Sequence, residues 1–390
     1  MKIAIISSNT KSPSTQRVKA VAIERGHKAK VLDPLRFTMY VDEVTPRLFY
    51  RAKALGRFDA VIPRIGAEVT FYGTAVIRQF ERMGVFCLNT SQSITSSRDK
   101  FRALQVLSQH RIAIAPTAYV RDPEAIPFAI EQVGGAPLII KVLEGTQGVG
   151  VILAETAKAA RAILETLQKA QQNVLVQRFL QESEGHDIRA LVVGGRVVAA
   201  MRRHAQAGEF RANVHRGGLA EAISLPSEHE RIAVASAEIL GLQVAGVDLI
   251  ESSAGPLVVE VNSSPGLTGI EQATGTNVAE AIVAHIEARM GFPALDLTAR
   301  LGLNSGYGIV DIEVRTDLAG KPIRESPLHE LAVKVLSLKR ESARIPNPPD
   351  TMPLLAGDLL TCYGSYESLR QLMPAGLPAR ARIRRRLVQA

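Results

Sequence analysis

Short apolar segments alternate with longer segments of helical spacing over residues 1–90. The apolar segments predict strands at 2–6, 29–33, 58–63 and 85–89, and the segments between them predict helices at 15–25 and 70–83, each followed by a glycine. Strands that alternate with helices pair in parallel and have both faces covered. The pattern therefore predicts a small doubly wound α/β domain. No G-x-G-x-x-G follows the first strand, so the dinucleotide-binding fingerprint is absent.

The middle of the chain is richer in strands. One helix is expected over 93–110, with an apolar stripe at Phe101, Leu104 and Leu107. Strands are expected at 116–120, 136–144, 149–155, 173–180, 186–195, 196–203, 244–250 and 256–262, and helices at 157–170, 228–240 and 277–290. The VGG turn before RVV is typical of a hairpin. This mixed order predicts an α+β body.

The pattern changes again after residue 290. Residues 291–308 lose their periodicity and are expected to be a linker. A small α/β unit follows over 309–373, with strands at 309–315, 332–340 and 357–364 and short helices at 328–331 and 367–372. Residues 374–390 form a basic tail. The segments before the linker are expected to form two domains, at 1–92 and 93–290.

Composition narrows the class of protein. A chain with 46% hydrophobic and 22% charged residues is typical of a soluble globular protein. No apolar run is long enough to span a membrane, and the N-terminal apolar segment is too short for a signal peptide. Only two cysteines occur, Cys87 and Cys362, which fits a reducing cytoplasm. Five of the nine net positive charges belong to arginines of the tail, so the rest of the chain carries a mild surplus that suits anionic substrates.

Oxygen-bearing side chains interrupt two of the predicted strands. Glu260 and Asn262 are two residues apart in LVVEVNSSPG, so they share one face of a strand. Asp248 lies in VAGVDLI, the strand expected just before. The first two residues alone fit either an edge strand with one wet face or a metal site. With Asp248 they make an all-oxygen set, which favours Mg²⁺ over zinc, since no Cys/His cluster exists.

A glycine-rich segment provides a second sign of nucleotide chemistry. Lys141 ends the apolar run PLII, and Gly145, Gly148 and Gly150 follow within the next nine residues. Glycines let backbone N–H groups wrap a phosphate, and a lysine adds a point charge. Taken alone, such a segment is more often a simple turn. Together with the oxygen set it indicates a nucleoside triphosphate bound with Mg²⁺.

At this point the order of motifs resembles a known family. The series Lys100, Lys141, EGTQGVG, VQRFL, Asp187, GEFRANVHRGG, Asp248 and EVNSSPG resembles the ATP-grasp superfamily. FDAVIPRIGAEVTFYGTAVIRQFE and VGGAPLIIKVLEGTQGVGV are similar to its RimK-type glutamate ligases, which act on the C-terminus of small-subunit ribosomal protein S-six. The likeness covers residues 1–290. It implies an ATP-grasp fold preceded by a Rossmann-like pre-ATP-grasp domain.

The resemblance implies roles for individual residues. ATP would be bound by Lys100, Lys141, the mobile loop with Gly145, Thr146, Gln147 and Gly148, the hinge of Gln177, Arg178, Phe179 and Leu180, the ribose ligand Asp187, and Arg211, Ala212 and Asn213. Arg203 and Arg211 would surround the γ-phosphate as catalytic residues, although a solvated strand face is their alternative. Asp248, Glu260 and Asn262 would bind Mg²⁺ or Mn²⁺, as two ions. Arg64 either helps to bind the acidic acceptor or belongs to an ordinary strand-end loop.

Two positions depart from the family pattern. Arg178 stands where the hinge usually carries an acid, which leaves nucleotide selectivity open. His204 replaces a second arginine after Arg203, which leaves open which anionic substrate is held there.

The implied reaction is an ATP-dependent carboxylate–amine ligation. The acceptor carboxylate would form an acyl-phosphate, and the amine of free L-glutamate would then form an amide. Two alternatives share the ATP residues: a ligase that makes a free dipeptide or polyglutamate, and a nucleotide-sensing regulator without turnover.

The last unit resembles a different family. The segments LAGKPIRE, VLSLKR and IPNPPDTMPLLAGDLL are similar to TrkA C-terminal (RCK-C) ligand-sensing domains, which pair as dimers. This implies a homo-oligomer, dimer or tetramer, and either a small regulatory ligand or a module that only adds stability. The arginine-rich tail either contacts ribosomal RNA or is simply disordered.

Overall fold

The computed structural model describes residues 1–42, 46–143, 150–183, 185–206, 218–290, 307–316, 318–341 and 343–372. The chain divides into two compact units, Met1–His285 and Ile286–Ala390. Each unit is described by itself. None of the helices in these ranges combines the length and apolar character that spanning a bilayer requires.

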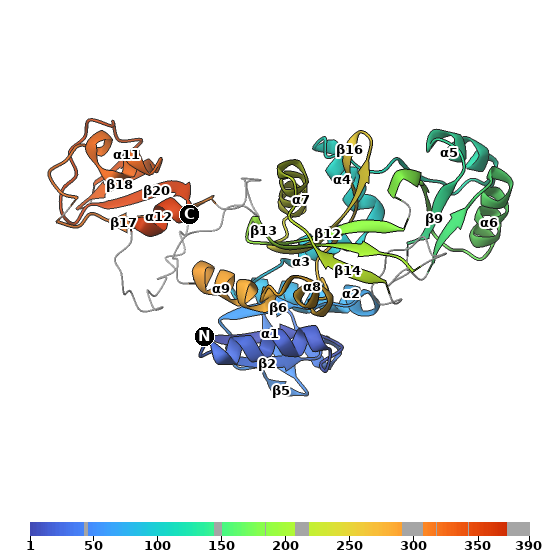
Figure 1. Cartoon of the computed structure of the whole chain (residues 1–390). Coiled ribbons are helices and arrows are strands. Elements are labelled where there is room, and N and C mark those ends of the chain that lie inside the picture. Colours follow the sequence, from blue (N-terminus) through green and yellow to red (C-terminus); the bar gives the residue numbers. More distant parts are fainter. Residues whose placement is uncertain are drawn as a thin grey trace. The chain divides into compact units, whose positions relative to one another are not determined.

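A four-stranded parallel sheet forms the N-terminal part of the first unit (Figure 1). Its order is β2-β1-β6-β7, with β1 (Lys2–Ile6), β2 (Lys28–Leu32), β6 (Ala60–Pro63) and β7 (Phe86–Cys87). The helices are α1 (Pro13–Glu24) and α2 (Thr70–Arg82). These elements confirm the doubly wound prediction. The alternation did not predict a small antiparallel sheet of β3 (Phe37–Tyr40), β4 (Arg47–Tyr50) and β5 (Lys53–Ala54).

The helix predicted over 93–110 is two helices, so this prediction was wrong. Helix α3 (Ser91–Arg98) ends at Asp99, and α4 (Lys100–Gln109) begins directly after it. Asp99 has extended backbone angles, and its side chain accepts a hydrogen bond from the Arg102 N–H at 3.0 Å, which caps α4. The break places Lys100 at the first position of α4.

A second sheet is antiparallel, in the order β10-β9-β11-β8. Its elements are β8 (Thr117–Tyr119), β9 (Leu138–Val142), β10 (Val151–Ala154), β11 (Val174–Arg178), α5 (Ile126–Gln132) and α6 (Ala157–Lys169). Leu138, Ile140 and Val176 pack with Leu164 of α6 in one apolar cluster. Because side chains alternate along a strand, Lys141 lies on the opposite face.

Gly150 closes the turn between β9 and β10. Its φ is +82°, and a Cβ there would lie 2.9 Å from the Val142 Cβ. Its carbonyl accepts a hydrogen bond from the Val142 N–H at 2.8 Å. Both the backbone angle and the lack of space require glycine at this position.

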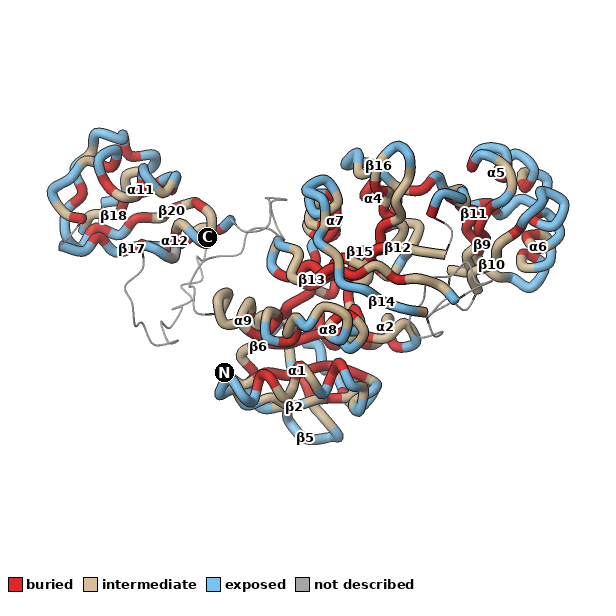
Figure 2. Tube along the Cα trace, in the orientation of Figure 1, coloured by how far each residue is buried: buried red, intermediate tan, exposed pale blue. Residues whose placement is uncertain are grey.

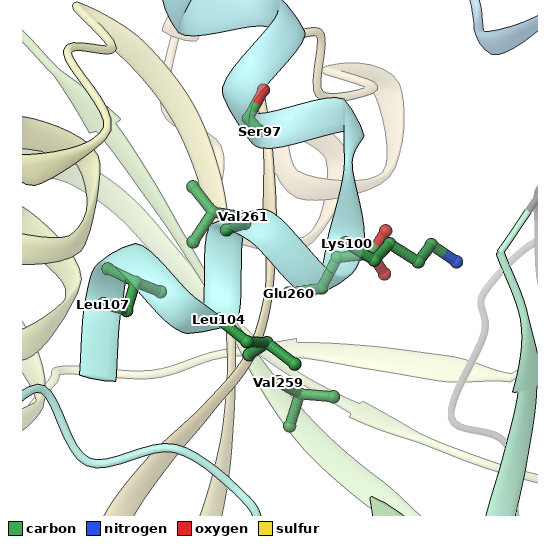
Figure 3. A pocket seen from close by; sticks show the side chains of 8 residues that line it. Ser97, Lys100, Leu104, Leu107, Val259, Glu260 and Val261 are labelled. Carbon is green, nitrogen blue, oxygen red and sulfur yellow. The ribbon is translucent and has the colours of Figure 1, made fainter. Parts of the chain in front are cut away.

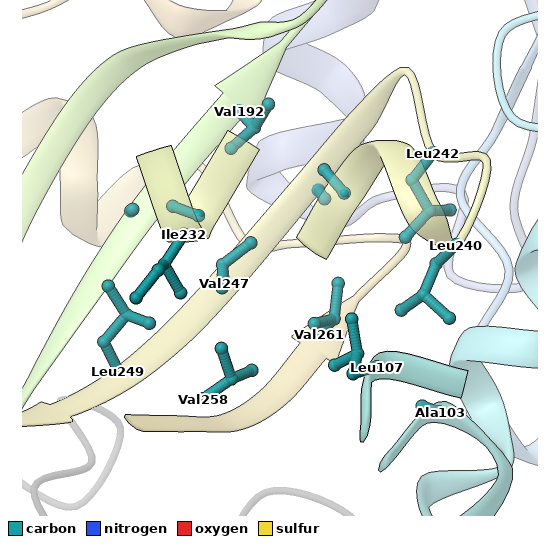
Figure 4. Packing of buried hydrophobic residues seen from close by; sticks show 14 of the residues in the cluster. Ala103, Leu107, Val192, Ile232, Leu240, Leu242, Val247, Leu249, Val258 and Val261 are labelled. Carbon is teal, nitrogen blue, oxygen red and sulfur yellow. The ribbon is translucent and has the colours of Figure 1, made fainter. Parts of the chain in front are cut away.

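The largest sheet has five strands, in the order β14-β13-β12-β15-β16. Its strands are β12 (His186–Val193), β13 (Arg196–His204), β14 (Leu219–Ala222), β15 (Val244–Ser252) and β16 (Gly255–Asn262). Figure 4 shows Val247, Leu249 and Val258 of this sheet packed with Ile232 of α7 (Ser227–Ile239) and Leu107 of α4. The predicted hairpin joins β12 to β13, with Gly194 and Gly195 at positive φ.

Burial in this sheet is greatest along β12 and β15 (Figure 2). The helices α8 (Thr268–Thr274) and α9 (Val278–Met290) follow β16 along the chain, and α8 contacts β13 and β14. Single-turn 3-10 helices lie at Pro34–Arg36, Ala67–Val69, Pro123–Ala125, Gln181–Ser183 and Ile323–Glu325.

The second unit contains one antiparallel sheet, in the order β17-β20-β18-β19. Its elements are β17 (Tyr307–Glu313), β18 (Lys334–Arg340), β19 (Ala343–Pro346), β20 (Leu359–Ser365), α11 (Pro327–Glu330) and α12 (Tyr366–Gln371). Val310, Leu328, Leu338, Leu360 and Leu369 are buried in its own core. Strand β17 begins inside the predicted linker, whose residues 291–306 lie outside the described ranges, as does the predicted tail.

Candidate active site

Three oxygen-bearing side chains share one face of the five-stranded sheet. In the antiparallel pair of β15 and β16, Asp248 is opposite Glu260 and Gly246 is opposite Asn262. Directly opposite residues point to the same side, and residues two apart on a strand do the same. The other face carries Val247, Leu249 and the apolar cluster. The predicted set of Asp248, Glu260 and Asn262 therefore lies together on the face away from that cluster.

Asp248 is held by two arginines. Arg189 on β12 donates from Nε and Nη2 to the two carboxylate oxygens at 2.7 and 2.6 Å. The Nη2 of Arg203 on β13 lies 3.2 Å from Oδ2 of the same carboxylate. Arg203 also makes a two-pronged contact with Asp187, at 2.6 Å for both bonds. The four residues form one network across three neighbouring strands.

The network sets the charge states of its members. Burial alone would raise the pKa of Asp248, but Arg189 and Arg203 outweigh it and lower that pKa to about 2. Burial opposes the charge on Arg203, yet Asp248 and Asp187 raise its pKa. For Asp187 burial prevails over Arg203, and its pKa is raised. Asp248 is therefore a carboxylate at any physiological pH.

Glu260 and Asn262 differ from Asp248. Within the described ranges neither side chain has a hydrogen bond or ion pair, so their oxygens are available to a ligand. In Figure 3 Glu260 and Lys100 extend to the same side of α4, away from Leu107. The described residues contain no cluster of three His, Cys, Asp or Glu side chains with metal-binding geometry. Two carboxylates and one amide fit the oxygen donors that Mg²⁺ prefers.

Lys141 of β9 lies within electrostatic range of charged residues of the five-stranded sheet. The pKa of Lys141 is lowered to about 8, because burial and the charge of Lys100 outweigh the opposite effects of Glu260, Asp248 and Asp187. These charges act on Lys141 only because the polar face of the five-stranded sheet lies near β9. Two predicted phosphate ligands, Lys100 and Lys141, are thereby brought together with the predicted metal ligands.

The predicted hinge lies at the end of β11. Gln177 is buried, and its side chain donates to the Thr117 hydroxyl at 2.7 Å. Arg178 is exposed, and its N–H donates to the Pro116 carbonyl at 2.9 Å. Among the described residues the N–H of Phe179 has no partner. The exposed Arg178 side chain is compatible with the predicted hinge, in which backbone groups would read the nucleotide.

Several predicted residues lie outside the described ranges. They are Gly145, Thr146, Gln147 and Gly148 of the glycine loop, and Arg211, Ala212 and Asn213. Arg64 is placed, and its Nη1 donates to the Pro265 carbonyl at 2.7 Å. His204 contacts Glu221, with 3.1 Å between Nε2 and Oε1.

Sequence reasoning missed Arg189. Its position two residues after Asp187 on the same strand is a signal, since both side chains must share a face. The partner of Arg189 is not visible in the sequence, because it depends on the register between β12 and β15.

Comparison with known proteins identifies the family. A model described as the RimK-like ATP-grasp domain matches residues 97–286, and one described as the RimK PreATP-grasp domain matches residues 1–94. A Rhodopirellula baltica protein named probable alpha-L-glutamate ligase is 53% identical over 376 residues, which are 96% of this chain and 93% of that protein. The chain belongs to the RimK-like ATP-grasp family. As a RimK-like protein it is an ADP-forming, ATP-dependent ligase, and the predicted ATP-grasp fold with a pre-ATP-grasp domain is confirmed.

Other relatives define the extent of the shared part. A Coxiella burnetii protein named probable alpha-L-glutamate ligase is 53% identical over 287 residues, which are 74% of this chain and 95% of that protein. The RimK-like fold also matches the ATP-grasp ligase PsnB solved with a precursor peptide and AMPPNP, with TM-score 0.58 and 23% identity over 73% of this chain and 97% of that one. A RimK domain ATP-grasp protein from Sphaerobacter thermophilus matches with TM-score 0.56 and 22% identity, covering 73% and 99% of the two chains. These structural matches support the fold alone.

Proposed function

We propose that this RimK-like ligase joins L-glutamate to the C-terminal carboxylate of a protein, and that the protein is small-subunit ribosomal protein S-six. The observation that carries the proposal is the single polar face on which Asp248, Glu260 and Asn262 lie near Lys141. The name that relatives with 53% identity carry supports glutamate as the substrate. The acceptor rests on the motifs that resemble the RimK-type ligases.

We assign ATP to the region between the β10-β9-β11-β8 sheet and the five-stranded sheet. Lys100 and Lys141 would contact its phosphates, the loop that contains Gly145 would cover them, and the backbone near Phe179 would read the adenine. In the structure both oxygens of Asp187 are bonded to Arg203, so contact with the ribose would require this pair to loosen. Asp248, Glu260 and Asn262 would hold Mg²⁺ or Mn²⁺, as two ions. A divalent cation at this site would neutralise charge on the phosphate oxygens.

The reaction requires two displacements. An oxygen of the acceptor carboxylate attacks the γ-phosphorus, the bond from that phosphorus to the β–γ bridging oxygen breaks, and ADP leaves. The amine of glutamate then attacks the acyl carbon and loses a proton, and inorganic phosphate leaves as the amide forms. Arg203, with Arg211, would stabilise the charge that develops on the transferred phosphoryl oxygens, and Arg189 would hold Asp248 in place. No nucleophilic side chain is needed.

The second unit extends the ligase in some relatives only. The match to the Coxiella protein spans 287 residues, which are 95% of that protein. The rest of the Coxiella protein is too short to contain a unit of this size. The match to the Rhodopirellula protein covers 96% of this chain and so includes the unit. We propose a TrkA-C-like module that makes the ligase an oligomer, dimer or tetramer, and binds a small regulatory ligand. A module that only adds stability is the alternative.

The function is tested by ADP release from purified protein with ATP, Mg²⁺ and L-glutamate, with and without purified ribosomal protein S-six, followed by intact mass. ADP that requires the acceptor, with mass increments of glutamate residues, supports the proposal. ADP formed with glutamate alone would favour a dipeptide or polyglutamate synthase, and no ADP in any mixture would favour a nucleotide-sensing regulator. The cytoplasmic location and the RNA contact of the tail stay predictions.

A further inference from the structure

Two half-buried arginines at one edge of the site lack partners for part of their side chains. The Nε atoms of Arg64 and Arg98 are shielded from solvent and have no hydrogen-bond partner among the described residues. The hydroxyls of Ser263 and Ser264, in the loop that follows β16, are in the same condition. Buried polar atoms are rarely left unpaired, because an unmade hydrogen bond costs free energy. Four such polar atoms lie at or beside one loop, where their hydrogen-bonding capacity is open to a bound group.

We call Arg64 and Arg98 the arginine pair. Arg64 directly follows β6, and its Nη1 donates to the Pro265 carbonyl at 2.7 Å. Arg98 ends α3, and its Nη2 donates to the Ile65 carbonyl. Arg98 is thus bonded to the residue that follows Arg64 in the chain, and Arg64 is bonded to the loop that follows β16. In the described ranges neither of them forms an ion pair with a carboxylate.

Burial disfavours the positive charge of both members of the arginine pair. Burial, and secondly the nearby charge of Arg98, together lower the pKa of Arg64 to about 10. Burial also lowers the pKa of Arg98, against the opposing effects of Glu260 and Glu68. Two like charges in a shielded place are stabilised when an anion binds between them.

The arginine pair borders the active site. Pro265, whose carbonyl binds Arg64, lies 2.9 Å from the point where a Cβ on Gly246 would stand. Arg189, the partner of Asp248, lies 3.9 Å from that same point. Glu260 acts on both Arg98 and Lys141. An anion held by the pair would therefore lie beside the predicted metal and phosphate ligands.

We propose that the arginine pair and the hydroxyl of Ser264 bind a substrate carboxylate that is not consumed in the reaction. This inference rests on the proposed ligase function. A guanidinium matches a carboxylate through parallel N–H donors, and a neighbouring hydroxyl donates one more hydrogen bond. The carboxylate has two sources: free L-glutamate, or an acidic residue near the end of the acceptor. In both cases the pair orients a substrate and takes no part in bond making.

Steady-state kinetics of Arg64→Gln and Arg98→Gln, with each substrate varied in turn, tests the proposal. We expect the KM of one carboxylate substrate to rise about 30-fold or more, as when a charge partner in a buried pair is removed. The KM for ATP should stay unchanged. Arg78→Gln is a matched control, since Arg78 is an exposed arginine of α2 in the same unit. Ser264→Ala should raise the same KM by a smaller factor.

Substrate analogues distinguish the two sources. If free glutamate fills the site, the wild-type enzyme rejects analogues in which one of its carboxylates is an amide, and the arginine variants lose that discrimination. If the acceptor fills the site, the wild-type enzyme rejects acceptor peptides in which an acidic residue is changed to its amide. The arginine variants then no longer discriminate against these peptides. Unchanged KM values for both carboxylate substrates, or a rise for ATP alone, would overturn the proposal.

Two further measurements separate the possible causes of failure. Arg98→Lys keeps a positive charge but has no parallel donors, so a folded Arg98→Lys with a raised carboxylate KM excludes misfolding as the cause. Calorimetric titration of L-glutamate, and separately of the acceptor peptide, measures binding without turnover. A wild-type protein that binds one of them and an Arg64→Gln variant that does not would support the arginine pair even if no ligation occurs. Equal binding by both proteins would contradict it.

Discussion

Both units contain two-pronged arginine–aspartate contacts, and the Arg340–Asp358 pair of the second unit differs in its surroundings from the Arg189–Asp248 pair of the first. In the second unit, Arg340 donates to Asp358 at 2.9 and 2.7 Å. The remaining contacts of that pair are to backbone: Arg340 donates to the Pro353 carbonyl and Asp358 accepts from the Leu355 N–H. This pair ties the end of β18 to the turn before β20.

In the first unit, the Arg189–Asp248 pair has equally short bonds, but its neighbours are charged and incompletely paired. Lys141 and Glu260 lie nearby without ion pairs among the described residues, and Arg203 links the pair to Asp187. The hydrogen bond from Arg340 lowers the pKa of Asp358 as well. A lowered carboxylate pKa therefore does not by itself distinguish the candidate site from the pair in the second unit. What distinguishes the candidate site is that Lys141 and Glu260, which have no ion pairs among the described residues, lie near the Arg189–Asp248 pair.

The largest expected effect is the loss of activity in Asp248→Asn. This change keeps the volume of the side chain but removes the charge that faces Arg189 and Arg203 and that would face the metal. We expect ADP formation to fall about 100-fold or more, as when a preorganised electrostatic contact is removed. Initial rates of ADP release measure it. Wild-type rates in a folded Asp248→Asn protein would remove Asp248 from the site.

The next effect concerns the pH dependence of ATP binding. The pKa of Lys141 is lowered to about 8, so its ammonium is charged at pH 7 and is lost as the pH rises through 8. We expect the KM for ATP to increase above pH 8, by up to about tenfold per pH unit. In Lys141→Arg the charge persists and this rise should disappear. A pH profile of KM that is the same in both proteins would show that Lys141 does not contact the phosphates.

Asp358→Asn tests the second pair. Arg340 and the Leu355 N–H lose the charge of a buried acceptor, so we expect the free energy of unfolding of the second unit to fall by about 1–3 kcal/mol. Urea unfolding followed by circular dichroism measures this loss. Initial rates of ADP formation should stay at the wild-type value without an added effector. Loss of ADP formation comparable to that of Asp248→Asn would abolish the contrast between the two pairs.

The smallest effect is expected for Glu165→Gln on α6. Glu165 accepts from the Arg161 Nε at 2.7 Å, but Arg161 is exposed and Glu165 is partly exposed. The change in the free energy of unfolding should stay below about 0.5 kcal/mol, because exposed pairs gain little. If Glu165→Gln lowered the free energy of unfolding as much as Asp358→Asn, burial would not explain why one pair is expected to stabilise the protein more than the other.

The elements with a clear period were predicted well. The strands β1, β12, β15 and β16 read directly from apolar runs, and the shared face of Glu260 and Asn262 follows from a spacing of two. The break at Asp99 was not predicted, because the same helical period continues across it. An aspartate there ends one helix and caps the next without interrupting the apolar stripe.

The contacts of the site were harder to predict than its strands. The bonds from Arg189 to Asp248 depend on the register of two strands that are separated by 50 residues or more. The arginine pair depends on how α3 packs beside the end of β6 and the loop after β16. No local pattern records such packing, so the sequence identified Arg64 without its neighbour Arg98.

The turn at Gly150 restricts how this protein can vary. A side chain at position 150 would meet Val142 and would also require a left-handed backbone, so both obstacles must be overcome together. A saturation library selected for ligation should return glycine there almost without exception, while the exposed positions of α6 accept many residues. Substitutions can thus accumulate at the exposed positions of α6, while position 150 keeps its glycine beside the predicted phosphate-binding loop.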